Sequence, residues 1–270
     1  MIKKPIFFSK EYFPLKAENR MSNVGNVEKA RDFFFSNRPP NLEFLLKKRY
    51  AWMNAFIKEG DKGIEVGCGS GFSKNFISSR EFLLTDVVKY EWVDQCVDAL
   101  NMPFKDSSLD FIVSSNMIHH LARPHEFFTE CSRVLKPDGF LIIQEVNASL
   151  VMRMFLKMMR HEGYSYDVNV FDKNFICNDP LDPWSANCVL PNLLFDDIKQ
   201  FEQHFPFQQI YHSYSEFLIL LISGGVTAKT KTVNLPLVVL NFVNKIDDFL
   251  IKLNKNIFAL QRQIVLRNKK

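Results

Sequence analysis

The chain has 270 residues, enough for one large α/β domain or for one domain with a substantial cap. Its hydrophobic fraction of 47% is ordinary for a folded protein, but 27 phenylalanines indicate a large aromatic core or an apolar cavity. The net charge of +4 is small and its basic residues are spread along the chain, so the composition argues against a nucleic-acid partner.

The cysteines and the apolar runs indicate which kinds of site and which cellular compartment to expect. Five cysteines are odd in number, widely spaced and without a C-x-x-C pair, so neither a disulfide framework nor a zinc site is indicated. No group of His, Cys, Asp and Glu has metal-ligand spacing in the sequence, and we expect no metal. The apolar run near the N-terminus is too short for a signal peptide, and no window has the length of a membrane span. These observations predict a cytoplasmic protein.

Residues 1–59 form an N-terminal segment without strand-like alternation. Apolar residues recur at helical spacings between Asn41 and Gly60, which predicts an amphipathic helix ahead of the main domain.

From residue 60 onward, short apolar runs alternate with helical stretches. A helix is expected to begin at Pro124 and to end before Gly139, because one apolar stripe lies between these two residues. Strands that alternate with helices predict an α/β fold with a doubly wound, mostly parallel sheet. The strands are expected at residues 63–66, 82–85, 93–97, 109–114 and 140–145.

After Val146 this alternation ends. A Met-rich helix over residues 149–163 is followed by an irregular stretch, residues 164–192, that holds three prolines. Strand-like and helical segments then return, with a last strand near Ile264. We expect residues 147–270 to contain a substrate-recognition insert and a C-terminal part that completes the sheet.

The segment "IEVGCGSGF" places Gly67, Gly69 and Gly71 directly after the first expected strand. A glycine-rich turn in this position brings the backbone close to a cofactor. The dinucleotide pattern G-x-G-x-x-G requires a third glycine where Phe72 stands, and this ring would obstruct a pyrophosphate. Carboxylates at Glu65 and Asp86 instead suit a ligand with a cationic ammonium group and a diol.

Four segments in order resemble those of class I S-adenosylmethionine-dependent methyltransferases, in the branch that includes ubiquinone- and menaquinone-biosynthesis enzymes. They are "GIEVGCGSG", "EFLLTDV", "VDALNMPFKDSSLDFIVSS", in which Met102 replaces the usual leucine, and "SSNMIHHL" with "ECSRVLKPDGFLII". The resemblance covers about residues 60–146, which would then be an S-adenosylmethionine-binding, Rossmann-like core. It implies a seven-stranded methyltransferase sheet with N-terminal helices and a C-terminal helical cap.

The resemblance also implies which residues hold S-adenosyl-L-methionine. Asp86 would bind the ribose hydroxyls, Asp98 would face the adenine amino group, and Val87 would pack on one face of the adenine. The cofactor-binding residues expected are Glu65, Gly67, Cys68, Gly69, Gly71, Asp86, Val87, Asp98, Ala99 and Asn116.

The reaction centre of the family falls at Asn116, and the neighbouring His119 and His120 are the best local candidates for a general base. Either histidine could equally orient the substrate or cap the short helix. The irregular stretch offers candidates for substrate contact, or it is a packed surface loop anchored by Trp184. These candidates are Tyr164, Tyr166, Asp172, Trp184 and Asn187.

The resulting hypothesis is a methyltransferase that acts on a small-molecule or saccharide acceptor. The alternative is a binding or scaffold protein that keeps the fold without turnover.

One long segment, residues 235–260, has apolar residues at three- and four-residue steps, the spacing of an amphipathic helix. We expect it to cover the core or to cap the substrate cleft. Membrane contact and a dimer interface stay open. Lys245, Lys252 and Lys255 favour an anionic membrane surface, whereas Asp247 and Asp248 oppose it.

Overall fold

The computed structural model describes residues 11–12, 26–160, 162–182, 184–227 and 231–270. Much of the expected N-terminal segment, before residue 26, therefore lies outside the described residues.

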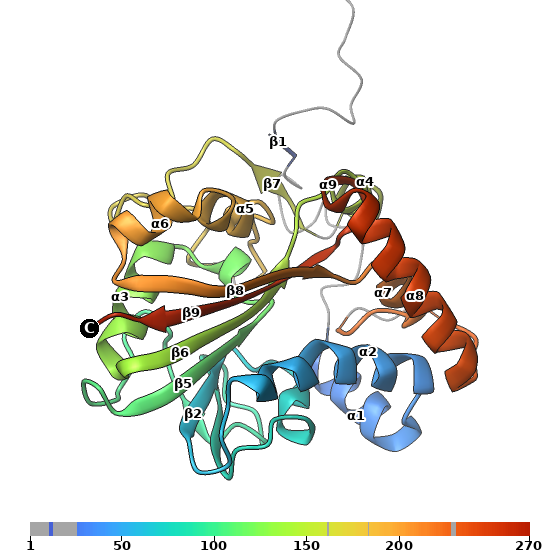
Figure 1. Cartoon of the computed structure of the whole chain (residues 1–270), viewed down its shortest axis with the longest axis horizontal. Coiled ribbons are helices and arrows are strands. Elements are labelled where there is room, and N and C mark those ends of the chain that lie inside the picture. Colours follow the sequence, from blue (N-terminus) through green and yellow to red (C-terminus); the bar gives the residue numbers. More distant parts are fainter. Residues whose placement is uncertain (1–10, 13–25, 161, 183, 228–230) are drawn as a thin grey trace, which may run out of the picture.

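A seven-stranded sheet forms the centre of the molecule (Figure 1), with the strand order β4-β3-β2-β5-β6-β9-β8. Strand β9 runs antiparallel to β6 and β8, and the strands from β4 to β6 are parallel to one another. This confirms the predicted doubly wound, mostly parallel α/β sheet. The bounds are β2 (Lys62–Val66), β3 (Glu81–Asp86), β4 (Gln95–Cys96), β5 (Leu109–Ser115), β6 (Leu135–Val146), β8 (Phe207–Ser215) and β9 (Gln261–Asn268).

Helices pack on both faces of the sheet and along one side of the molecule (Figure 1). Their bounds are α1 (Val27–Asn37), α2 (Pro40–Tyr50), α3 (Pro124–Val134), α4 (Leu150–Met159), α5 (Leu190–Phe195), α6 (Ile198–His204), α7 (Leu218–Ile222), α8 (Leu237–Leu253) and α9 (Lys255–Phe258), with the 3-10 turns η3 (Ala51–Ala55), η4 (Phe72–Asn75) and η5 (Ile118–His120).

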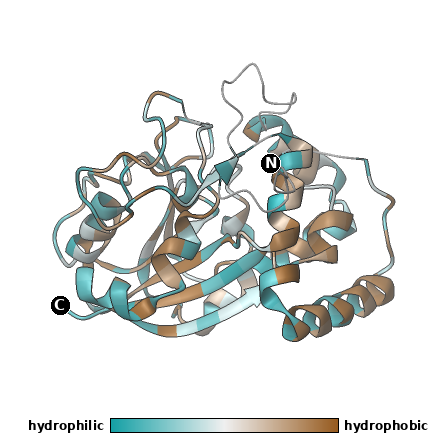
Figure 2. Cartoon of the chain, turned by 90° about the horizontal axis from the view of Figure 1, so that it is seen from above, coloured by the Kyte–Doolittle hydropathy of each residue, from teal (hydrophilic) through white to brown (hydrophobic). Residues whose placement is uncertain are grey.

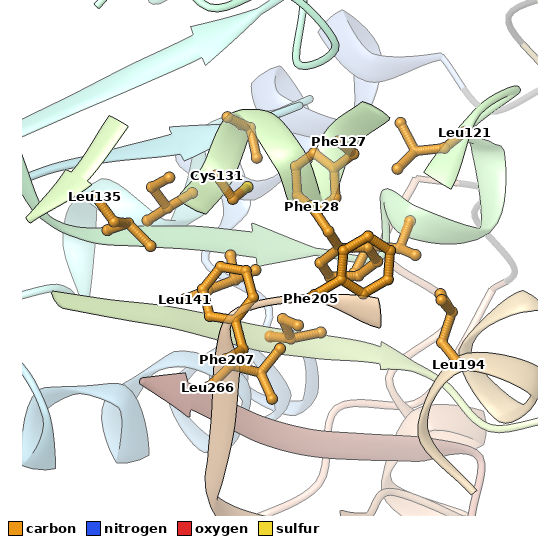
Figure 3. Close-up of a cluster of buried hydrophobic side chains, with 14 of the residues drawn as sticks. Leu121, Phe127, Phe128, Cys131, Leu135, Leu141, Leu194, Phe205, Phe207 and Leu266 are labelled. Carbon is orange, nitrogen blue, oxygen red and sulfur yellow. The ribbon is translucent and has the colours of Figure 1, made fainter. Parts of the chain in front are cut away.

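Alternating side chains of the strands supply two hydrophobic clusters, one on each face of the sheet. In β5, Ile112 belongs to the cluster beneath α3, α5 and α6, whereas Phe111 and Val113 belong to the cluster beneath α1 and α2. Figure 3 shows the first cluster, in which Phe127, Phe128 and Phe205 lie together. Here the abundant phenylalanine of the sequence fills a packed core.

The order of the strands reverses next to β2. From β2 the chain moves outward to β3 and β4, and it then returns to place β5 on the opposite side of β2. In open α/β sheets the crevice at the carboxyl ends of two such strands is where ligands bind.

Two further elements of the chain are short. The glycine turn is followed by the single turn η4, after which the Phe76 carbonyl accepts a hydrogen bond from Asn54 Nδ2 at 2.7 Å. The N-terminal segment, expected to lack strands, contributes β1 (Glu11–Tyr12), which pairs antiparallel with β7 (Tyr164–Ser165). Two residues are too few for an alternation pattern to be visible in the sequence.

A buried ion pair joins the N-terminal helices to the C-terminal half of the chain. Arg49 at the end of α2 donates from Nε and Nη2 to the two carboxylate oxygens of Glu216, at 3.0 and 2.6 Å. Gln144 Nε2 of β6 donates to the same carboxylate at 3.2 Å. Both charged side chains are buried, so neither can exchange its partner for water.

We expect Glu216→Gln to lower the free energy of unfolding by about 3 kcal/mol, because it leaves the Arg49 charge buried without a counter-charge. Replacing both partners, as in Arg49→Met/Glu216→Met, should cost less than the single change. Urea denaturation of the three proteins measures both effects. A single variant within 1 kcal/mol of the wild type would contradict this role for the pair.

Candidate functional site

The three glycines of the turn after β2 all have left-handed backbone angles, with φ of 64°, 50° and 64°. A Cβ on Gly67 would lie 2.5 Å from Met117, and one on Gly71 would lie 2.8 Å from Leu84 and Trp92. At Gly69, in contrast, no heavy atom of the described residues lies within 4 Å of the Cβ position, its chain neighbours aside. The protein's own packing therefore requires two of the glycines, and the third faces open space that a ligand can fill.

Hydrogen bonds to two other segments, α1 and the turn around Trp92, hold this glycine loop. Arg31 of α1 donates to the Ser70 carbonyl at 2.7 Å, and Trp92 Nε1 donates to the Gly69 carbonyl at 2.8 Å. The Ser70 hydroxyl donates to the Val27 carbonyl at 3.0 Å. Helix α1 is thereby fixed over the loop.

The two acids of the predicted cofactor site lie on either side of the loop backbone. Glu65 is buried and accepts a hydrogen bond from the Ser73 hydroxyl. Burial, opposed by that hydrogen bond and assisted by Asp86, raises the pKa of Glu65 to about 8. Asp86 accepts hydrogen bonds from the backbone N–H groups of Gly69 at 2.9 Å and Val88 at 3.0 Å. Both carboxylates therefore shape the loop itself.

The residues expected around the adenine lie farther out along the edge of the sheet. Val87 is 70% exposed, and Asp98 is exposed and accepts from the Leu100 N–H at 2.9 Å. Ala99 is half-buried against the core. An exposed apolar side chain directly after a buried carboxylate is a surface on which a flat ring can pack.

A cavity of about 390 Å³ opens beside the glycine loop. Seven of the predicted site residues line it, namely Gly67, Cys68, Gly69, Asn116, His119, His120 and Trp184. Glu65, Gly71, Asp86, Val87, Asp98 and Ala99 are outside this lining. The cavity therefore extends from the loop toward the histidines.

Several lining residues were missed by the sequence analysis, because they come from elements far from the glycine turn. Arg49 and Tyr50 end α2, Glu162 follows α4, and Gln261 begins β9. The Tyr50 hydroxyl hydrogen-bonds with Ser115 at the end of β5. No motif or spacing marks these positions, since only the folded sheet brings them together.

Asn116 sits at the carboxyl end of β5 with a left-handed φ of 53°, and its N–H donates to the Gln144 carbonyl at 2.8 Å. Such a conformation is uncommon for a residue with a side chain, although asparagine tolerates it better than most. The turn directs the chain into η5, which carries both histidines.

Glu145 at the end of β6 anchors the histidine pair. Its carboxylate accepts from the Ile118 N–H at 2.8 Å and from the Val146 N–H at 2.7 Å, and it contacts His119 Nδ1 at 2.5 Å. On the other side, His119 Nε2 lies 3.7 Å from Glu162. His119 is thus buried between two carboxylates.

The adjacent histidines titrate in opposite directions. Burial opposes the charged form of His119, but Glu145 and Glu162 outweigh it and raise the pKa of His119 to about 10. Burial and the neighbouring positive charge lower the pKa of His120 to about 4. Near neutral pH, His119 is therefore the imidazolium and His120 the neutral imidazole.

The tautomer of His120 follows from its hydrogen bond. His120 Nδ1 lies 3.1 Å from the Ser185 carbonyl, which can only accept, so the neutral ring carries its proton on Nδ1. His120 Nε2 is then the unprotonated nitrogen and can take up a proton.

The folded chain also brings His119, Glu162 and Cys188 together, with one ligand-type atom of each within 4.8 Å of the others. Their sequence spacing gives no sign of this cluster. Cys188 Sγ donates to Glu162 at 3.2 Å, and burial holds the pKa of this thiol well above its ordinary value.

The five candidates for substrate contact have different environments. Trp184 lines the cavity, Tyr166 is partly exposed, and Asp172 is an exposed turn residue. Tyr164 is fully buried, and Asn187 uses its side chain to pair with the backbone of Ser165 while its N–H donates to the His119 carbonyl. Tyr164 and Asn187 therefore support the irregular stretch of residues 164–192 from the interior of the protein.

Comparisons with known proteins agree with this geometry. Residues 64–143 match a family described as methyltransferase domain. A biotin biosynthesis bifunctional protein of Cellvibrio japonicus is 30% identical over 123 residues, which are 40% of this chain and 24% of that protein. A probable tRNA methyltransferase 9B of Homo sapiens is 25% identical over 68% of this chain and 37% of that protein. The chain thus spans less than two fifths of the length of these relatives.

Among solved structures, a SAM dependent methyltransferase from Archaeoglobus fulgidus has a TM-score of 0.52 and covers 88% of this chain and 99% of its own. At 19% identity this likeness concerns the fold. The family match contains the glycine loop, both flanking acids and the histidine pair within one continuous range. Residues 64–143 are therefore a methyltransferase domain of the class I S-adenosylmethionine-dependent type, and the cofactor of this domain is S-adenosyl-L-methionine.

Proposed function

We propose that the protein transfers a methyl group from S-adenosyl-L-methionine to a small-molecule or glycan-type acceptor held in the cavity beside the glycine loop. The observation that carries this proposal is the neutral, correctly protonated His120 in the wall of the same cavity as Gly69. The cofactor supplies an activated methyl group, so the protein's tasks are alignment, exclusion of water and removal of a proton.

The residues of the loop fit the expected cofactor. The open space over Gly69 lets an amino-acid chain lie flat against the backbone. Asp86 would accept hydrogen bonds from the ribose hydroxyls, and Asp98 would face the adenine amino group, with Val87 against the ring. Glu65 would act one layer below by holding Ser73 and the loop.

The two histidines have different roles in proton transfer. His119, charged and buried between Glu145 and Glu162, is a positioning residue that fixes η5 and keeps a positive charge beside its neighbour. That charge keeps His120 neutral, so the lone pair of Nε2, 3.9 Å from Glu162, can accept the proton of a hydroxyl or amine acceptor as the methyl group is transferred. Such general-base assistance contributes about a hundredfold or more to rate.

The acceptor class rests on the shape and lining of the site. The cavity is small and is walled by Tyr50, Trp184 and Arg49, groups that pack against and hydrogen-bond a compact polar molecule. A nucleic-acid acceptor is the competing case, because one relative is a probable tRNA methyltransferase. If the protein methylated a tRNA pool in preference to sugars and small molecules, the acceptor would be a nucleic acid.

The non-enzymatic alternative, a scaffold that binds the cofactor without turnover, makes a separate prediction. It requires S-adenosylmethionine binding without release of S-adenosylhomocysteine across a broad acceptor screen. The enzyme hypothesis requires both S-adenosylmethionine binding and release of S-adenosylhomocysteine.

Asp86→Ala should weaken S-adenosylmethionine binding about ten- to a hundredfold, because a charged acceptor of two hydrogen bonds is removed. Isothermal titration calorimetry measures the dissociation constant. Glu81→Ala, an exposed acid at the opposite end of β3, is the matched control and should bind normally. Unchanged affinity of the Asp86 variant, or tighter binding of NAD than of S-adenosylmethionine, would sink the assignment.

His120→Ala should lower turnover by about a hundredfold and leave the cofactor dissociation constant unchanged. Release of S-adenosylhomocysteine, with an acceptor identified by screening sugars, amines and phenols, is the readout. His204→Asn, a change at an exposed histidine of α6, is the control. Near-normal turnover without the His120 ring would show that alignment alone carries catalysis.

The raised pKa of His119 predicts a pH-dependent contribution to stability. Its folded value of about 10 lies above the unfolded value, so the contribution is full below about pH 6.5 and is lost as the pH rises through 10. The difference in unfolding free energy between the wild type and His119→Gln should therefore shrink from pH 6 to pH 10. Urea denaturation at several pH values tests this, and a constant difference would refute it.

A further inference from the structure

Helix α8 has two apolar faces. Its inward face contains Leu240, Asp247 and Ile251, which are buried where the helix contacts α7, α2 and β8. On the opposite side, four large apolar side chains recur at helical spacing and stay 64–79% exposed, namely Val238, Phe242, Phe249 and Leu253. We call these four residues the outer stripe. A helix that only covers its own domain carries polar residues on that side.

Figure 2 shows α8 as a largely hydrophobic helix along one outer side of the molecule. Packing against the domain, as expected from the sequence, therefore leaves several large apolar side chains of this helix exposed. Within the described residues, no helix combines the length and apolar character needed to cross a bilayer.

Two lysines lie beside the outer stripe, together with Asp248, which is exposed but paired with Lys48 of α2. Lys245 and Lys252 are exposed and lie on the same side of the helix as Phe249, at four- and three-residue steps. Their positions beside the stripe allow both ammonium groups to reach a surface that the stripe contacts.

The two acids that opposed a membrane in the sequence are directed elsewhere. Asp247 is buried and accepts from the backbone N–H groups of Phe217, Leu218 and Ile219, at 3.0, 2.7 and 3.2 Å, at the start of α7. Asp248 forms an ion pair with Lys48 of α2 at 3.3 Å. Neither carboxylate belongs to the outer stripe.

We propose that α8 docks the protein on an anionic lipid bilayer, with the outer stripe at the boundary of headgroups and acyl chains and Lys245 and Lys252 on lipid phosphates. A helix of this composition lies in the plane of the interface. A second copy of the chain fits less well. In a two-fold contact the same patch meets itself, so Lys245 and Lys252 of both copies would face each other, while the neighbouring Asp248 is already paired with Lys48.

The docking surface is connected to the cavity through neighbouring helices. Leu220 of α7 and Met152 of α4 line the cavity, and α7 packs directly on α8. Helix α4 also carries exposed Met154 and Met158, and α9 contacts both α4 and α8. The proposal does not depend on methyl transfer and is tested without it.

Flotation of the full-length protein with vesicles tests the proposal. We expect the protein to co-float with vesicles of phosphatidylcholine and phosphatidylglycerol (about 7:3), and flotation to fall at high salt, since each lysine contributes about a fivefold increase in affinity. Phe249→Gln/Leu253→Gln should reduce vesicle affinity at least tenfold, and Lys245→Gln/Lys252→Gln should remove the preference for the anionic lipid. The control Leu181→Gln removes a 91% exposed apolar side chain elsewhere and should float normally.

Because the substituted side chains are exposed, the variants should keep the wild-type melting temperature. Absence of wild-type flotation, or equal flotation of the stripe variant, would overturn the proposal. A concentration-dependent dimer in sedimentation velocity that the Phe249→Gln/Leu253→Gln change abolishes, without vesicle binding by the wild type, would assign the stripe to a second copy instead.

Discussion

The reversal of strand order beside β2 is the constraint on which the site depends. Because β3 and β5 flank the same strand but are reached in opposite directions, the turns after β2 and β5 diverge and leave room between them. The glycine loop occupies one wall of that room and η5 the other. Backbone geometry, with left-handed φ values at Gly69 and at Asn116, shapes both walls. The chemistry of the cavity therefore rests on the topology before any side chain is considered.

His119 and His120 are adjacent histidines, but burial and nearby charges shift their pKa values in opposite directions. His119 has carboxylates on both sides, whereas His120 has a backbone carbonyl at Nδ1 and a cation beside it. One ring is thereby kept charged and the other neutral at the same pH. This division needs no unusual residue type, only the placement of Glu145 at the end of β6 and of Glu162 after α4.

The features that could be predicted are those that depend on residues close together in the sequence. The sequence predicts β2, β3, β5 and β6 within a few residues at most ends, although β6 begins earlier, at Leu135, and β4 is shorter than expected. The glycines of the loop mark it in the sequence because its left-handed backbone conformation favours glycine. Arg49, Glu162 and Gln261 were not predictable as cavity residues, because only contacts between separate elements of the fold bring them to the cavity. Placement within the quinone-biosynthesis branch, the domain boundaries and the roles of the site residues stay predictions.

Strand β9 has a kinetic consequence for the newly made chain. It is inserted between β6 and β8, and all of its residues except Arg267 are buried. Until residues 261–268 arrive, β6 and β8 have no hydrogen bonds to each other, and each presents an open edge to other chains. During synthesis, the parallel half of the sheet can assemble while its antiparallel half waits for β9, long after β6 has been made. The antiparallel half of the sheet therefore closes only after residues 261–268 have been made, and until then the β6 edge can pair with other chains.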